Sequence, residues 1–338
     1  MSSSISSSEP RGWRRFLVVY ALTATLGGGV LAAGLCLIDP FDTGRFGAVT
    51  GAGMPHAGPR LVNASRGRDP QFDSAVIGNS HAQLIMPERL SVLTGHRFVT
   101  LTTPGTGPME QLAMARWFVT HHRDRIGALV IGLDQMWCQP NGELAPPNPF
   151  PFWLYASDPF TYVSGLLKTD NLKHAWRRLA LFAGLEPAAR ADGYEDYDQG
   201  RVWRIEEVEA RLAEGSPWAV TGVTGKPSFP ALTLLRAFLP SLPPGTALSL
   251  VFTPMHTRAL PVPDSPGARL MAHCKEAVRA LATDYGPAAV VDLLDRGTIS
   301  DDTANFWDLT HYRAPVARIV EDGIATSLPV TRASAALR

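Results

Sequence analysis

Two short polar segments, far apart in the chain, carry the residue types of a nucleophilic serine site. The first is Gly78-Asn79-Ser80, which directly follows the apolar run at 74–77. The second is Asp308-Leu309-Thr310-His311, the only Asp-x-x-His in the chain. A serine hydroxyl becomes a nucleophile when a histidine takes its proton, and a carboxylate holds that imidazole in the required tautomer. The pattern therefore predicts Ser80 as nucleophile, His311 as base and Asp308 as the orienting acid.

Each segment also has a purely structural interpretation. A Gly-x-Ser triplet is expected about once or twice by chance in a chain of this length. An Asp-x-x-His segment can be a helix N-cap beside a hydrogen-bonded histidine. The position of Ser80 favours the chemical interpretation, because Ser80 follows a predicted strand and precedes a predicted helix. The amides that open that helix point at whatever binds there.

The elements that must position these residues alternate between short apolar runs and helical stretches. The apolar runs predict strands at 74–77, 98–101, 128–131, 247–252 and 288–292. Helices are predicted at about 82–93, 108–122, 229–239, 266–284 and 313–326. Such alternation predicts a three-layer α/β/α fold with a parallel five-stranded sheet in the flavodoxin-like order 2-1-3-4-5. Ligands of this fold bind at the carboxyl ends of the strands, where Ser80 and His311 are expected.

The alternation is interrupted at about 138–228, which we interpret as an insertion after the third strand. An insertion beside strand tips commonly shapes a binding site. Its acidic residues Glu195, Asp196 and Asp198 could bind Ca²⁺, but they lack EF-hand spacing, so a solvated acidic loop is favoured. Its aromatic residues could stack on sugar rings, although packing of the insertion is the favoured interpretation. These residues are Trp137, Phe150, Phe152, Trp153 and Tyr155.

The N-terminus indicates a membrane anchor. Residues 16–38 carry no charge over a length sufficient to span a bilayer. Arginines precede this segment, and the positive-inside rule then keeps the N-terminal tail cytoplasmic. Cleavage as a signal peptide is the alternative to an uncleaved anchor. The predicted division is a cytoplasmic tail at 1–15, a transmembrane anchor at 16–38, a connector at 39–70 and an extracytoplasmic, periplasmic domain at 71–330.

Composition argues against other classes of function. Lys+Arg and Asp+Glu both number 31, so the chain lacks the basic excess that a nucleic-acid partner would favour. No Cys/His cluster has zinc spacing, and neither a metal nor a cofactor is predicted. Cys138 and Cys274 could pair in an exported domain, but two buried unpaired thiols are the favoured interpretation.

Together these segments resemble the SGNH (GDSL-like) hydrolases. In that family the nucleophile lies in a Gly-Asp-Ser-like block after strand 1, as Gly78-Asn79-Ser80 does here, and an Asp-x-x-His block ends the domain. A block after strand 2 supplies a glycine N–H to the oxyanion hole. Residues 102–108 occupy its place, with Gly105 preferred over Gly107. The resemblance implies an oxyanion hole formed by the N–H groups of Ser80 and Gly105.

The block after strand 3 departs from the family pattern. The family has Gly-x-Asn there, whereas this chain has Gly132-Leu133-Asp134. An ionised aspartate accepts hydrogen bonds and cannot donate one. Loss of one oxyanion donor costs about 2.7–4 kcal/mol of transition-state stabilisation. Three explanations stay open: Gln135 supplies the donor, Asp134 is protonated, or the site accepts a different acyl geometry.

Among SGNH proteins, the architecture is most similar to the membrane-anchored DltD-like group. The resemblance implies an acyl esterase or O-acyltransferase acting on a cell-envelope or exported polysaccharide. It implies an acyl donor, a saccharide or polymer acceptor and a membrane-bound O-acyltransferase as partner. The alternative, favoured by Asp134, is a non-catalytic SGNH-like binding or assembly module. Candidate substrate contacts are Asn79, His81, Asp134 and His256. His256 could contact substrate or replace His311 as base, but a structural role is favoured because no acid lies at matching spacing.

Overall fold

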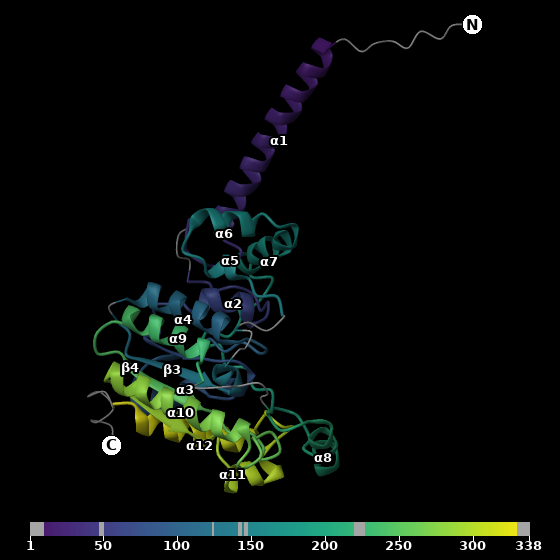
Figure 1. Ribbon diagram of the computed structural model, residues 1–338. Helices are drawn as coiled ribbons and strands as arrows, with labels where there is room; N and C mark the ends of the chain where they lie inside the picture. The colour runs from purple at the N-terminus through teal and green to yellow at the C-terminus, as the bar shows by residue number, and fades with distance from the viewer. Residues whose placement is uncertain are drawn as a thin grey trace.

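A single long helix, α1 (Pro10–Ile38), projects from the rest of the molecule (Figure 1). The computed structural model describes residues 10–46, 51–123, 125–140, 144, 148–219 and 227–329. Within these residues, Gly12–Ile38 is long and apolar enough to cross a membrane, with a mean hydropathy of 1.9 and little burial. This helix is consistent with the predicted anchor.

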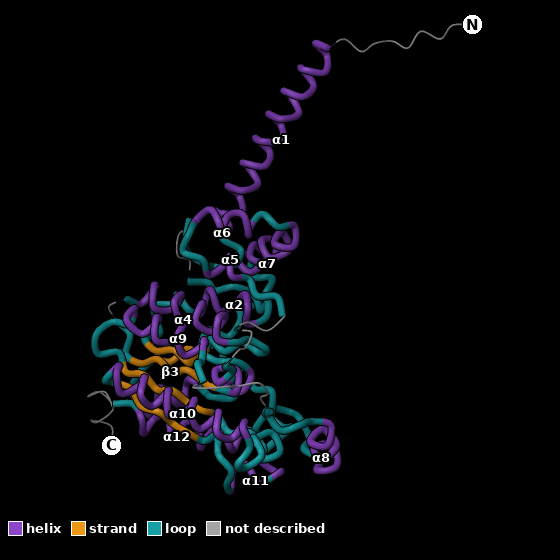
Figure 2. Tube along the Cα trace, in the orientation of Figure 1, coloured by secondary structure: helices purple, strands orange, loops and turns teal. Residues whose placement is uncertain are grey.

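The centre of the molecule is a β-sheet, drawn in orange in Figure 2. Its five strands are all parallel and lie in the order β2-β1-β3-β4-β5, as predicted. Val76 of β1 pairs with Thr100 of β2 on one side and with Val130 of β3 on the other. The edge strand β5 is half-buried, whereas the other four strands are fully buried. The strands are β1 (Ser74–Ile77), β2 (Phe98–Thr100), β3 (Ala128–Leu133), β4 (Ala247–Phe252) and β5 (Ala288–Asp292).

Helices cover both faces of the sheet because successive strand residues point to opposite sides. Ala75 and Ile77 belong to the core beneath α4 (Pro108–His122), α9 (Pro230–Phe238) and α10 (Pro266–Tyr285). Val76 belongs to the core beneath α3 (Pro87–Thr94) and α12 (Ala314–Ser327). The fold is therefore the predicted three-layer α/β/α arrangement.

One predicted helix is divided in the structure. The stretch predicted at 82–93 consists of a 3₁₀ turn, η1 (Ser80–Ala82), and the separate helix α3, which begins at Pro87. Proline lacks an N–H and suits the first turn of a helix, so α3 starts there instead of continuing from η1. The consequence is that Ser80 lies on a tight turn.

The region between β3 and α9 lies at two ends of the molecule (Figure 1). Its helices α5 (Phe152–Tyr155), α6 (Pro159–Leu166) and α7 (Leu172–Phe182) lie at the foot of α1, and α8 (Ile205–Glu214) lies at the far end. The 3₁₀ turn η3 (Thr169–Asn171) lies between α6 and α7. The remaining short elements are α2 (Pro59–Arg66), η2 (Gln135–Cys138), η4 (Leu239–Ser241), α11 (Thr298–Asp301) and η5 (Thr303–Asn305).

The segment predicted as a connector packs against the body. Phe41 is fully buried, and Asp42 forms ion pairs with the buried guanidinium groups of Arg68 and Arg178. Arg178 lies on α7 and Arg68 follows α2. These contacts join the end of α1 to both the insertion and the sheet domain.

The two cysteines expected to be unpaired form a disulfide. Cys138 ends η2 and Cys274 lies in the middle of α10, and their sulfurs are bonded. The favoured prediction was wrong because the turn after β3 packs against α10, which brings residues 136 positions apart together in the core. That contact depends on tertiary packing and leaves no local signal.

Candidate active site

Ser80 stands on a turn that only glycine at position 78 permits. After β1 the chain passes through Gly78 and Asn79 into η1. A Cβ at Gly78 would lie 2.7 Å from the Cβ of Ala82, closer than side-chain atoms approach. Asn79 caps the turn, since its Oδ1 accepts a hydrogen bond from the His81 N–H at 3.0 Å. Gly78 and Asn79 thus hold the partly exposed Ser80 at the carboxyl edge of the sheet.

The structure brings Ser80, His311 and Asp308 together. The Ser80 Oγ lies 2.9 Å from His311 Nε2, and His311 Nδ1 lies 2.8 Å from Asp308 Oδ2. The two contacts use opposite nitrogens of one imidazole. With Nδ1–H donating to Asp308, Nε2 is left to accept the Ser80 hydroxyl proton. This is the arrangement required for a serine nucleophile with a histidine base.

The Asp308–His311 segment is a closed turn rather than a helix start. The Trp307 N–H donates to the His311 carbonyl at 2.8 Å, and Asp308 Oδ1 accepts the N–H groups of Thr310 and His311. Although burial acts to raise the pKa of Asp308, the hydrogen bond and charge of His311 and these two N–H donors lower it well below its usual range. Asp308 is therefore ionised at neutral pH.

The insertion braces this turn, a role that the sequence did not indicate. Tyr197 packs edge-on against His311 at 5.8 Å between ring centroids, and its hydroxyl donates to the Tyr312 carbonyl. Asp198 accepts the Trp307 indole N–H at 2.7 Å and the Ala314 N–H at 2.8 Å. The interpretation of Asp198 as part of a solvated acidic loop was wrong, because its carboxylate ties the insertion to the turn.

The other two acidic residues near Asp198 do not converge with it. Glu195 lies 3.9 Å from Arg66, and Asp196 accepts the N–H groups of Asp198 and Gln199. Within the described ranges, no group of three or more His, Cys, Asp or Glu side chains could hold a metal ion.

His256 supports the Asp308–His311 turn through a backbone hydrogen bond. Its backbone N–H donates to the Leu309 carbonyl at 3.0 Å. Its Nδ1 accepts the Arg258 N–H at 3.1 Å, and its Nε2 lies 3.3 Å from Thr303 Oγ1. Burial lowers the pKa of His256, which favours the neutral ring that these contacts require. This placement favours the structural interpretation of His256 over a direct substrate contact.

Asp134 is buried and surrounded by donors. Its Oδ2 accepts the Asn79 amide and lies 3.5 Å from His81 Nδ1, and its Oδ1 accepts the Met136 N–H at 2.8 Å. Burial acts to raise the pKa of Asp134, but the contacts with His81, Asn79 and Met136 lower it overall. Asp134 is therefore an ionised acceptor that positions Asn79 and His81, and a protonated Asp134 is not supported.

The His81 ring contacts both Asp134 and the ring of His311, the predicted base. It lies edge-to-face with the His311 ring at 5.6 Å between centroids. Its Nδ1 is buried and lies 3.5 Å from Asp134 Oδ2, and within the described residues it has no hydrogen-bond partner. Two histidine–carboxylate pairs, His311–Asp308 and His81–Asp134, therefore lie side by side at the Ser80 turn.

The predicted oxyanion donors lie in the loops around this turn. Gly105 is exposed and has φ +64°, the left-handed region that favours glycine. Its loop approaches the site where the Asn79 amide reaches the Thr106 carbonyl at 3.5 Å. The N–H of the alternative, Gly107, already donates to Glu110. Gln135 opens η2 half-buried, and its side chain makes no hydrogen bond within the part of the chain that the structure describes.

The aromatic residues of the insertion mainly pack. Trp137 is fully buried and donates to Gln111, and Tyr155 is buried against Phe150. Trp153 packs on Phe41, which follows the end of α1. These contacts favour the packing interpretation over sugar stacking.

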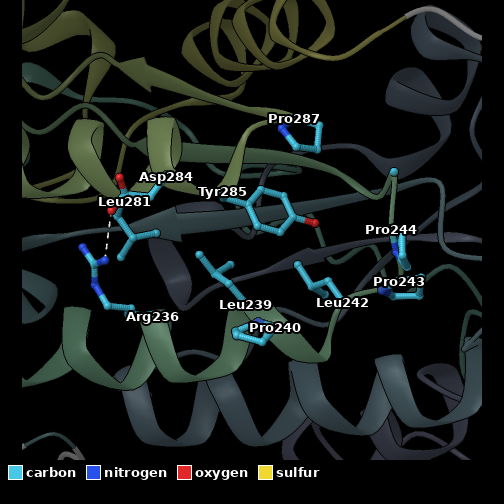
Figure 3. Close-up of a pocket in the computed structure, with 11 residues that line it drawn as sticks. Arg236, Leu239, Pro240, Leu242, Pro243, Pro244, Leu281, Asp284, Tyr285 and Pro287 are labelled. Carbon is cyan, nitrogen blue, oxygen red and sulfur yellow. Dashed lines mark hydrogen bonds and ion pairs between the residues drawn. The ribbon is translucent and has the colours of Figure 1, made fainter.

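A cavity of about 340 Å³, whose lining residues are drawn in Figure 3, lies apart from this site. It is lined by Pro243, Pro244 and Pro287, which precede β4 and β5, and is flanked by an Arg236–Asp284 ion pair. It therefore lies at the amino ends of the strands, and Ser80 lies at the carboxyl ends.

No family model matches the chain, and no curated protein matches it. The resemblance to SGNH hydrolases therefore stays a prediction from the residue pattern.

Proposed function

We propose that this chain is a membrane-anchored, extracytoplasmic SGNH-type serine acyl esterase or O-acyltransferase that acts on a cell-envelope or exported polysaccharide. The observation that carries the proposal is the hydrogen-bonded series from Ser80 Oγ through His311 to Asp308. Residues 231 positions apart meet there with the separations that proton transfer needs. A structural serine has no need of a histidine that is itself oriented by an ionised carboxylate.

In the first half-reaction, Ser80 Oγ attacks the acyl carbonyl while His311 Nε2 takes the hydroxyl proton. Asp308 stabilises the imidazolium that forms. The carbonyl oxygen becomes an oxyanion beside the N–H groups of Ser80 and Gly105. Collapse expels the alcohol of the donor, which leaves with the proton from His311, and an acyl-serine forms.

In the second half-reaction, His311 takes a proton from the acceptor hydroxyl, which attacks the acyl-serine. A saccharide hydroxyl gives transfer, and water gives hydrolysis. Proton return from His311 to Ser80 Oγ restores the starting state. The polysaccharide acceptor and a membrane-bound O-acyltransferase as donor partner follow from the resemblance to DltD-like proteins.

Two features support an extracytoplasmic location. The apolar α1 precedes the domain, with arginines before its apolar stretch. The Cys138–Cys274 disulfide lies in the domain core, and disulfides persist in oxidising compartments. A periplasmic domain on a membrane-spanning anchor whose N-terminal end is cytoplasmic satisfies both.

A non-catalytic SGNH-like binding or assembly module is the second candidate, and the ionised Asp134 favours it. The carboxylate of Asp134, in the block after strand 3, offers no hydrogen-bond donor to an oxyanion and adds negative charge near it. Asp134 accepts hydrogen bonds from Asn79 and Met136, and the His81 ring lies 3.5 Å from it, so its charge is partly compensated, which supports catalysis.

The test uses the full chain in detergent with a panel of aryl acyl esters, with and without neutral oligosaccharide acceptors. We expect hydrolysis or acyl transfer by the wild type and loss to background in Ser80→Ala. The matched control is Ser157→Ala, an exposed serine outside the site, which should retain wild-type activity. Activity that survives Ser80→Ala, or none across the panel, would count against the enzyme.

A further inference from the structure

Large apolar side chains are exposed on α6, on α7 and in the segments that directly follow these helices. Phe160, Trp176 and Leu185 are 80%, 73% and 81% exposed. Leu167, Leu172, Leu179 and Phe182 are each between 42% and 46% exposed. We call these seven residues the α6–α7 apolar face. Apolar side chains gathered in this way on a soluble surface mark an interaction site.

The spacing along α7 shows that the exposure is systematic. Leu172, Trp176 and Leu179 are separated by four and three residues, so they lie on one side of the helix. The opposite side is buried, where His174 packs on Phe41 and Arg178 pairs with Asp42. A helix on a protein surrounded by water turns its apolar side to the core. The orientation of α7 is the reverse.

The apolar face is continuous with the anchor. Helices α6 and α7 both contact α1, and Figure 1 shows them at its foot, between α1 and the sheet domain. Leu35, in the last turn of α1, is buried there. At 1.5 Å per residue, the 27 residues of Gly12–Ile38 extend about 40 Å, against a hydrocarbon thickness of about 30 Å. The last turns of α1 therefore reach the headgroup region, together with α6 and α7.

The residue types suit that region. Tryptophan is enriched at membrane interfaces, where Trp176 would lie. Lys168 and Lys173 are exposed beside the apolar residues and can extend their ammonium groups to lipid phosphates. A helix with one apolar side and flanking basic residues is typical of interfacial membrane binding.

We propose that the α6–α7 apolar face is a membrane-docking surface, which inserts into the lipid leaflet at the foot of α1. The occupant is the bilayer itself, because the face is joined to the one helix in the described chain that can cross it. Docking holds the α/β domain against the membrane instead of leaving it on a flexible tether. The proposal rests on the anchor in the proposed function and is independent of the chemistry at Ser80.

The test places an environment-sensitive fluorophore on the full chain reconstituted in phosphatidylcholine–phosphatidylglycerol vesicles. The background is Cys36→Ala, and the labelled positions are Trp176→Cys and, if that variant fails to fold, Leu185→Cys. The matched control is Val262→Cys, which is 55% exposed in the loop before α10. Lipids carrying a quencher near the headgroup report contact with the bilayer.

We expect a blue shift and loss of most of the fluorescence at position 176 or 185, with neither change at 262. A label at 176 and 185 that stays in water would overturn the proposal. A label that is shielded from water but not quenched by the lipids, together with a dimer in detergent, would show that the face binds a second copy of the chain. That result would also overturn the membrane-docking proposal. Because fluorescence is the readout, an inactive Ser80 would not affect the outcome.

Discussion

At the scale of single residues, Asp134 departs most from the pattern that the site resembles. The carboxylate is buried, yet it accepts hydrogen bonds from Asn79 and Met136, and His81 Nδ1 lies 3.5 Å from it. Its role is therefore to hold Asn79, which precedes Ser80, by a hydrogen bond and to pair with the His81 ring, which follows Ser80. The donor that an asparagine would give to the oxyanion must then come from backbone N–H groups or from Gln135.

Asp134→Asn should lower reactivity at Ser80. The amide would present one acceptor oxygen where the carboxylate presents two, so with the Met136 N–H still bound the Asn79 amide would lose a charge-assisted hydrogen bond worth about 1.5–3 kcal/mol. That loss corresponds to a roughly 10- to 100-fold slower reaction of Ser80. The rate of labelling by a serine-directed fluorophosphonate measures it without knowledge of the substrate.

Asp170→Asn, an exposed aspartate on η3, is the matched control for this substitution and should label at the wild-type rate. Faster labelling of Asp134→Asn would contradict this account. It would show that an amide at this position donates to the oxyanion, as in the family pattern.

The residue types of the triad could be predicted from sequence, because a unique Asp-x-x-His and a Gly-x-Ser after a strand are local patterns. The second pair, His81–Asp134, could not, since its members belong to turns after different strands. The same holds for Tyr197 and Asp198, which reach His311 and Trp307 from an insertion with no internal pattern.

At the scale of elements, the contact between α3 and α12 includes a buried acid. Glu321 accepts the Met86 N–H at 2.7 Å and pairs with Arg89 at 3.2 Å and Arg318 at 3.0 Å. Burial nevertheless raises the pKa of Glu321 to about 6, despite the lowering effect of these partners. The folded protein therefore binds this proton more tightly than the unfolded chain, and this contribution to stability is lost as pH rises from about 4.5 to about 6.

Glu321→Gln should become more stable relative to wild type as pH rises. At pH 4 both side chains are neutral, so the difference in unfolding free energy is at its baseline. Above pH 6 only the glutamate carries a buried charge, and a raised pKa of this size corresponds to about 2 kcal/mol in favour of the variant. Thermal unfolding in detergent at pH 4 and pH 7.5 measures the difference. A difference that does not change with pH would refute the assignment.

Strand positions followed closely from the sequence, because buried parallel strands are short apolar runs bounded by turn residues. The predicted run at 128–131 extends to Leu133 in the structure, and the one at 98–101 ends at Thr100. The helix predicted at 82–93 was less accurate, since Pro87 starts a new helix. That division is what leaves Ser80 on a turn of its own.

At the scale of the whole molecule, the Cys138–Cys274 disulfide joins the turn after β3 to α10 across 136 residues. The double variant Cys138→Ala/Cys274→Ala should lose about 2–5 kcal/mol of stability, because the bond restricts the unfolded chain. We expect a fall of several degrees in Tm, equal to the fall that a reductant causes in the wild type. An unchanged Tm, or a reductant effect that persists in the double variant, would contradict the pairing.

The whole-molecule account joins an anchor, a membrane-docking face and a serine site at the sheet edge. Its central claim is that Ser80 is activated by His311. The most direct measurement is labelling of the intact full chain by a fluorophosphonate probe, with the modified residue located by peptide mass. The account predicts modification of Ser80 in the wild type and in His273→Ala, an exposed histidine of α10, and its loss in His311→Ala. No labelling of the wild type, or equal labelling in His311→Ala, would contradict it.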